Sequence, residues 1–160
     1  MRFPQSTIDQ IEPASFGRLR LNNGSVAGLP LLLEPQIACF NRTRVAKSPS
    51  SLQGLLELAE TGIEIGFSLD YGGLYWIAGP LGAAPALKTV ALGQPITPAQ
   101  RQQVRYWLQW IQAAQLLQHI NYYGPEEDLV QGLMQGRLDW IPCHSNTLVR
   151  LRQKLGPRLA

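Results

Sequence analysis

The sequence predicts an α/β fold in which a single β-sheet is flanked by helices. Short apolar segments typical of strands, such as residues 63–67 and 138–142, alternate along the chain with segments of helical periodicity. Of the 160 residues, 45% are hydrophobic and 16% are charged, which is enough apolar side chain to form a core. The chain has two cysteines, so a disulfide-rich scaffold is excluded and at most one bridge is possible.

The N-terminal part of the chain is expected to hold an arm and a hairpin. Residues 1–15 are polar and show no period, so we expect a flexible arm, followed by one α/β domain over residues 16–160. Residues 16–21 alternate apolar side chains with polar ones or glycine, which predicts a strand. The Asn-Asn-Gly sequence at residues 22–24 then predicts a hairpin turn, because Asn and Gly tolerate positive φ.

Caps and periodicity define the elements expected in the rest of the chain. Serine and threonine accept hydrogen bonds from the free N–H groups of a first helical turn, proline is tolerated there, and glycine ends helices. The expected helices cover residues 48–62, 74–84, 97–120, 125–136 and 146–155, with strands at 63–67 and 138–142, a turn at 71–73 and an irregular connector at 86–95. Along the longest helix, an apolar stripe is expected at Val104, Trp107, Leu108, Ile111 and Ala114.

The residues that could support metal binding or catalysis are few. Cys143 and His144, with Cys39 and His119 elsewhere, lack the close paired spacing of zinc ligands, so we expect no metal and no cofactor. Adjacent residues of a strand point to opposite faces, which disfavours Cys143 and His144 as a nucleophile and its base. No G-x-S-x-G motif occurs either. We therefore expect no catalytic residue and a protein that is not an enzyme.

Three polar or aromatic groups have structural explanations as well as functional ones. Glu126, Glu127 and Asp128 are interpreted as acidic residues favoured by the dipole at a helix start. The glycine pair at residues 72–73 precedes a helix and could hold a polar ligand atom, although a tight turn is the favoured role. Tyr71 is placed where it could be exposed for stacking, a use that binding clefts make of aromatic rings.

Charge and hydropathy limit the partners. A net charge of +3 without a concentrated basic stripe does not indicate a nucleic-acid binder. The chain has no run of about 18 apolar residues, so we expect no membrane span. Its start lacks the apolar stretch of a secretory signal, which predicts a cytoplasmic protein as given, or a periplasmic one if the sequence is a fragment of a secreted chain.

The order of two segments is specific enough to resemble a family. Residues 26–31 contain a Gly-x-Pro strand, followed by a strand that ends in Phe40-Asn41-Arg42. Residues 128–140, DLVQGLMQGRLDW, follow the long helix and lead into the last strand. This order resembles the second lobe of type 2 periplasmic solute-binding proteins of ABC importers, the family that includes maltose-binding protein. The resemblance implies a single mixed β-sheet flanked by helices and spans roughly residues 26–156.

The resemblance also implies a binding site and a function. Its ligand contacts fall on the turn after one strand and just after the returning strand, at Asp70, Tyr71, Gly72, Tyr75, His144, Ser145 and Asn146. The implied function is non-catalytic binding of a small polar solute or a protein partner. The alternative is a protein-interaction module that kept the fold without a solute site. An open concavity at Tyr71, Tyr75 and His144 would favour the solute, and closed packing there would favour the interaction module.

One geometric expectation underlies this interpretation. In such a lobe the strands around Ile37 and Ile141 are neighbours in one sheet. Cys39 and Cys143 then lie near each other in space.

Overall fold

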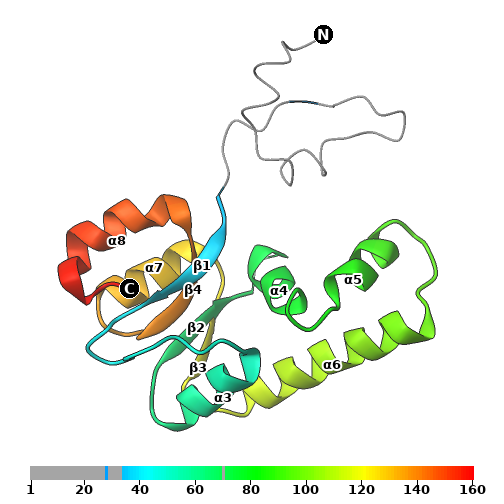
Figure 1. Ribbon diagram of the computed structural model, residues 1–160, viewed down its shortest axis with the longest axis horizontal. Coiled ribbons are helices and arrows are strands. Elements are labelled where there is room, and N and C mark those ends of the chain that lie inside the picture. Colours follow the sequence, from blue (N-terminus) through cyan, green and yellow to red (C-terminus); the bar gives the residue numbers. More distant parts are fainter. Residues whose placement is uncertain (1–27, 29–33, 70) are drawn as a thin grey trace. The chain divides into compact units, whose positions relative to one another are not determined.

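A computed structural model describes Gly28, residues 34–69 and residues 71–160 (Figure 1). The chain divides after Glu34 into two units, and the second unit, Pro35–Ala160, contains all the elements described below. The arm predicted at residues 1–15, the strand at 16–21 and the hairpin turn at 22–24 lie outside the described residues.

The second unit is built on one mixed β-sheet, as predicted. Its strands are β1 (Gln36–Phe40), β2 (Ile65–Ser68), β3 (Ile120–Tyr123) and β4 (Trp140–His144), in the spatial order β1-β4-β2-β3. Strand β2 runs parallel to β3 and β4, whereas β1 runs antiparallel to β4. Ile37 pairs with Cys143, and Cys39 pairs with Ile141. The expectation that the segments around Ile37 and Ile141 are neighbours in one sheet is therefore confirmed.

Helices cover both faces of the sheet. They are α3 (Leu52–Glu60), α4 (Tyr71–Ala78), α5 (Ala84–Ala91), α6 (Pro98–Gln115), α7 (Glu126–Met134) and α8 (Leu148–Leu155), with short 3-10 turns at Ser145–Thr147 and Gly156–Arg158. Helices α3, α4 and α6 lie on one side of the sheet, and α7 and α8 lie on the other (Figure 1). Three layers result, because each face of a sheet needs a helical cover to exclude water.

The helix boundaries follow the caps that the sequence predicts. The Ser51 hydroxyl accepts a hydrogen bond from the Gly54 N–H at 3.0 Å and so begins α3. Thr97 and Gln100 form a reciprocal capping box at the start of α6. Gly136 has a φ of +72° just after α7, a conformation that glycine adopts without strain.

Three predictions between β2 and α7 are wrong. The expected turn at residues 71–73 is the first turn of α4, and most of the expected connector at 86–95 belongs to α5. The start of α4 lies against the end of β2, and position 73 needs glycine because a Cβ there would lie 2.1 Å from the Ser68 Oγ. Residues 120–123, expected to end the long helix, form strand β3 instead. A strand of four residues is too short to show a clear alternation.

The predicted stripe on α6 is confirmed at Trp107, Ile111 and Ala114, which pack on the first core, but it differs at one edge. Leu108 is 53% exposed, whereas Trp110, outside the predicted stripe, is 7% exposed. The Trp110 indole N–H donates to the Leu52 carbonyl oxygen at 3.1 Å, which satisfies its polar atom in the core.

Each face of the sheet has its own hydrophobic core. Phe67 is the centre of the first core, with the rings of Trp76, Trp110, Tyr122 and Trp140 at centroid distances of 5.6–6.4 Å. The second core lies under α7 and α8 and includes Leu129, Leu133, Leu138, Ile141 and Leu151. The alternation of side chains along β2 separates the two cores, because Phe67 faces one and Gly66 the other.

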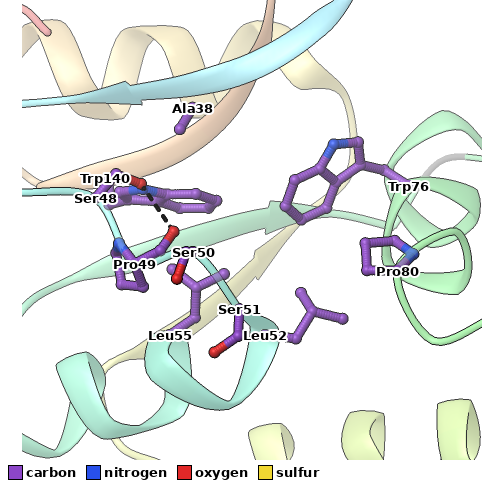
Figure 2. A pocket seen from close by; sticks show the side chains of 10 residues that line it. All are labelled: Ala38, Ser48, Pro49, Ser50, Ser51, Leu52, Leu55, Trp76, Pro80 and Trp140. Carbon is purple, nitrogen blue, oxygen red and sulfur yellow. Dashed lines mark hydrogen bonds between the residues drawn. The ribbon is translucent and has the colours of Figure 1, made fainter.

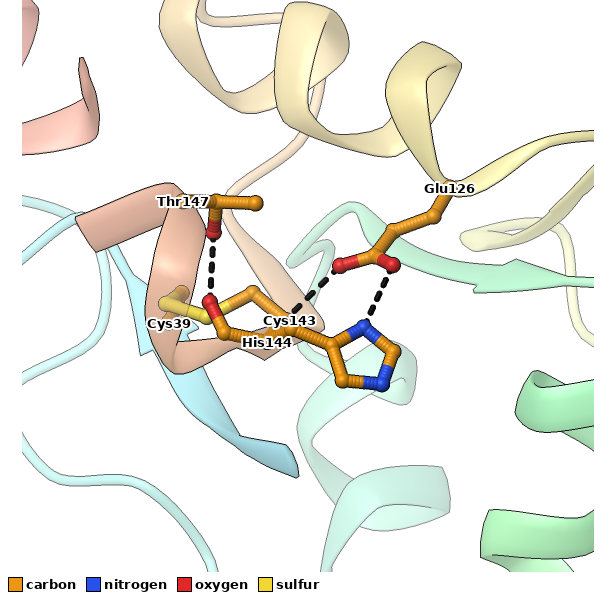
Figure 3. Close-up of a disulfide and its surroundings, with 5 residues drawn as sticks. All are labelled: Cys39, Glu126, Cys143, His144 and Thr147. Atoms are coloured by element: carbon orange, nitrogen blue, oxygen red, sulfur yellow. Dashed lines mark hydrogen bonds and ion pairs between the residues drawn. A yellow bond between two sulfur atoms is a disulfide. The ribbon is translucent and has the colours of Figure 1, made fainter. Parts of the chain in front are cut away.

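The two cysteines form a disulfide inside the second core. Cys39 and Cys143 are both fully buried, with their Cα atoms 5.9 Å apart (Figure 3). The expectation that these residues lie near each other is confirmed. The bond joins β1 to β4 and closes a segment with a sequence separation of 104 residues.

Candidate functional site

Three parallel strands end at the same edge of the sheet. The carboxyl edge, as we name it, comprises the ends of β2, β3 and β4 with the segments that directly follow them. The chain leaves β2 into α4 on one face, whereas it leaves β3 and β4 into α7 and α8 on the other. In open α/β sheets, ligands bind outside the carboxyl ends of strands whose connections depart to opposite faces. The carboxyl edge therefore has the topology of a binding site.

A histidine–glutamate pair organises this edge (Figure 3). His144 ends β4, and Glu126 is the first residue of α7. One carboxylate oxygen of Glu126 accepts the His144 backbone N–H at 2.9 Å, and the other lies 2.5 Å from the ring Nδ1. Both side chains are partly exposed, at 30% for His144 and 26% for Glu126. Because both carboxylate oxygens hold the same residue, the ring is fixed with Nε2 facing away from Glu126.

The other residues predicted for the site fall into two groups at the same edge. Ser145 and Asn146 lie in the 3-10 turn after β4, Ser145 half-buried and Asn146 exposed. Tyr71, Gly72 and Tyr75 lie on the first two turns of α4, directly after β2. Asp70 lies outside the described residues. The topology thus brings both predicted segments to one edge, and their contact with a ligand stays a prediction.

Glu126 is a candidate site residue that the sequence interpretation does not single out. It was explained by helix-start electrostatics alone, and its partner is 18 residues further along the chain. Only the parallel placement of β3 and β4 brings α7's first residue beside the end of β4. No short-range sequence pattern contains that information. The neighbouring Glu127 is exposed, and hydrogen bonds from Arg150 and Gln131 lower the pKa of its carboxyl group.

A second histidine–glutamate pair lies at the opposite, amino edge of the strands. The His119 Nδ1 lies 2.7 Å from one carboxylate oxygen of Glu64, and the Asn121 side-chain amide donates to the other at 2.7 Å. Partial burial acts to raise the pKa of Glu64, but the hydrogen bonds from His119 and Asn121, aided by the charges of His119 and Arg44, outweigh it and lower that pKa. This pair joins the segments that precede β2 and β3, so it is a structural counterpart to the pair at the carboxyl edge.

Two polar atoms in the first core stand out. The Tyr122 hydroxyl and the Trp107 Nε1 are buried and have no hydrogen-bond partner within the part of the chain that the structure describes. Burial raises the pKa of Tyr122, because the charged phenolate would lose its hydration.

Residues 34–69 and 71–160 contain neither a cluster of metal ligands nor a helix able to span a membrane. Within these residues, no group of three or more His, Cys, Asp and Glu side chains is arranged to hold a metal ion. No helix of this part has the length and hydropathy needed to cross a membrane.

Solved structures similar to the chain include two whose names refer to transport or to a bound metal. One is the spermidine/putrescine ABC transporter substrate-binding protein PotD from Streptococcus pneumoniae, with a TM-score of 0.62 and 15% identity over all of this chain and 46% of PotD. The second is iron-bound HitA from Pseudomonas aeruginosa, with a TM-score of 0.56 and 15% identity over all of this chain and 45% of HitA.

The fold is that of one lobe of a solute-binding protein. This chain spans less than half the length of PotD and of HitA. No family model matches the sequence, and no curated protein matches it. The α/β fold with one mixed sheet flanked by helices is confirmed.

Proposed function

We propose that the described unit binds a small polar solute at the carboxyl edge, without catalysis. In this proposal the His144 ring contacts the solute, and Glu126 is a positioning residue that holds the ring. The supporting observation is the use of both Glu126 oxygens on one residue, at 2.9 Å to the backbone N–H and 2.5 Å to Nδ1. Such a carboxylate fixes the orientation of an imidazole ring before a ligand binds. The ring therefore loses little rotational freedom when Nε2 contacts the ligand.

The groups around His144 suit a polar ligand. Ser145 offers a hydroxyl, exposed Asn146 offers both an acceptor and two donors, and α4 begins at the same edge of the sheet after β2. In the proposal, Asp70, Tyr71, Gly72 and Tyr75 supply the contacts from the α4 side. The names of the two similar structures also favour a small solute, since PotD is named for spermidine and putrescine and HitA holds iron.

The proposal extends to family and compartment. We propose that the unit corresponds to the second lobe of a type 2 solute-binding protein of an ABC importer, in the group that includes maltose-binding protein. The buried Cys39–Cys143 disulfide supports an oxidising compartment such as the periplasm, because disulfides rarely persist in a reducing cytosol. One lobe supplies one wall of a cleft, so we expect weak binding, with a Kd on the order of 1 mM, when this chain is tested alone.

A thermal-shift screen tests the solute proposal. The probes are putrescine, spermidine, glucose, glycine, glutamate and phosphate, because a ligand of the native state raises Tm by mass action. His144→Ala should abolish the rise given by the best probe. His119→Ala is the matched control, since it removes the histidine of the other His–Glu pair at the opposite edge, and it should keep the rise.

Two results would contradict the proposal. An equal rise in the His144→Ala variant would place binding elsewhere. If no probe raises Tm, the protein-interaction module without a solute site becomes the better explanation of the fold.

A further inference from the structure

A pocket lies on the face of the sheet that α3 and α4 cover (Figure 2). It has a volume of about 150 Å³ and lies between the start of α3, the end of α4 and strands β1 and β4. Its walls are mainly apolar, and the residues that the argument uses are Ala38, Ser48, Ser50, Leu52, Trp76 and Trp140.

This pocket is separate from the proposed solute site. Of the predicted site residues whose side chains the structure describes, His144, Ser145 and Asn146, none lines it. Trp140 begins β4 and His144 ends it, which separates their Cα atoms by about 13 Å at 3.3 Å per residue. The His144 side of the solute site is therefore distinct from this pocket.

The aromatic walls are held in place without a ligand. The Trp140 side chain is almost fully buried, and its indole N–H donates to the Ser48 hydroxyl at 2.9 Å. The ring of Trp76 lies 6.0 Å from that of Trp140, and both contact Phe67. A pocket with fixed walls loses little freedom when a ligand enters, so even a small ligand can bind measurably.

The size and chemistry of the pocket select its ligand. An apolar cavity of about 150 Å³ accommodates one benzene-sized ring. Among the described residues, those that line the pocket include no charged side chain, and the hydroxyl of exposed Ser50 lies at the rim. Tryptophan faces also attract cations, but a cation here would lose hydration without gaining a carboxylate partner.

We propose that this pocket binds a single uncharged aromatic ring carrying one polar substituent, of the size of phenol. The ring packs against Trp76 and Trp140 by dispersion and edge-to-face contact, and its substituent points to the rim at Ser50. Such a ring is either a small molecule or part of a larger ligand, and free phenol represents both.

NMR of the tryptophan indole N–H groups in the full chain tests this site. Phenol, titrated into the millimolar range, should shift the Trp76 and Trp140 signals saturably, with a Kd on the order of 1 mM. Trp107, which does not line the pocket, is an internal control and should stay unshifted. Tetramethylammonium, the cationic probe of similar size, should leave all signals in place.

Two variants fill the pocket from different sides. Ala38→Leu adds volume from β1, and Ser50→Leu covers the rim from an exposed position. Each should weaken phenol binding by at least about tenfold. Gln112→Leu adds an equal apolar group at an exposed position of α6 outside the pocket and should leave binding unchanged. If Ala38→Leu fails to fold, Ser50→Leu decides.

Four results would overturn the proposal. These are no shift of the Trp76 and Trp140 signals, an equal shift of the Trp107 signal, unchanged affinity in the folded filling variants, and tighter binding of tetramethylammonium than of phenol. The last result would assign the pocket to a cation instead.

Discussion

Reduction of the Cys39–Cys143 disulfide should destabilise the described unit strongly. The bond closes a loop with a sequence separation of 104 residues, almost the whole unit. The loss of chain entropy that such a cross-link imposes on the unfolded state, −2.1 − 1.5R ln n cal/mol/K, amounts to about 4.7 kcal/mol at 25 °C for this loop. Total stabilities of domains are about 5–15 kcal/mol, so the bond accounts for a large share of the stability.

Urea unfolding with and without a reducing agent measures this effect. Tryptophan fluorescence should report the transition, since three indoles lie around Phe67 in the first core. With an m value of about 2 kcal/mol/M, the midpoint should fall by about 2 M urea on reduction. Reduction retains both sulfur atoms in the core, so it isolates the cross-link from the loss of packing that a Cys→Ala double variant would add.

A thiol titration in denaturant makes the comparison decisive. It should find no free thiol in the oxidised sample and two in the reduced one. An unchanged midpoint in a sample with two titrated thiols would refute the entropy argument. Two free thiols in a sample purified without reductant would refute the bond itself.

Three further predictions concern packing, charge and binding. Gly66→Ala should lower the free energy of unfolding in urea by about 1–3 kcal/mol, because the new Cβ would lie 2.6 Å from the Leu138 Cδ1. The double variant with Leu138→Ala should lose less stability than the sum of the two single variants, and additive losses would contradict the clash. Glu64→Gln should lower the free energy of unfolding by at most about 1 kcal/mol at pH 7, a small effect because the side chain is 38% exposed. Since folding lowers the pKa of Glu64 from 4.5, this loss of stability should be complete above pH 4.5 and should disappear as the pH falls through the folded pKa. A loss of stability that grows in acid would contradict this prediction. Glu126→Gln should weaken binding of the best solute about tenfold, while Tm of the free protein changes little. Calorimetric titration measures this affinity, with His144→Ala as the reference for complete loss of binding. Unchanged binding in Glu126→Gln would show that the residue has only a structural role.

The parts of the fold that could be predicted from sequence are those with local signals. The cap at Ser51, the capping box at Thr97 and the glycine after α7 each act within one helical turn, so they define α3, α6 and α7 closely. The pairing of β1 with β4 was inferred from a family resemblance, since it joins segments about 100 residues apart.

The errors arise where distant contacts decide the structure. Residues 120–123 form a strand because β2 offers a free edge beside them, which outweighs their position after a long helix. Gly72 and Gly73 suggested a turn, but the close approach of α4 to Ser68 needs a residue without a side chain at position 73. Glu126 contacts His144 only because the fold places the start of α7 beside the end of β4. The sequence indicated both halves of the candidate site but not the carboxylate that orients its histidine.

The register of the antiparallel pair links the candidate site to the beginning of the second unit. Gln36 lies opposite His144, and the Ser145 N–H donates to the Pro35 carbonyl oxygen at 3.1 Å. A solute that moves Ser145 would therefore lengthen or shorten this hydrogen bond to Pro35, the residue directly before β1. A fluorescent label on exposed Glu34 would then serve as an optical reporter of occupancy, with no probe placed in the site itself.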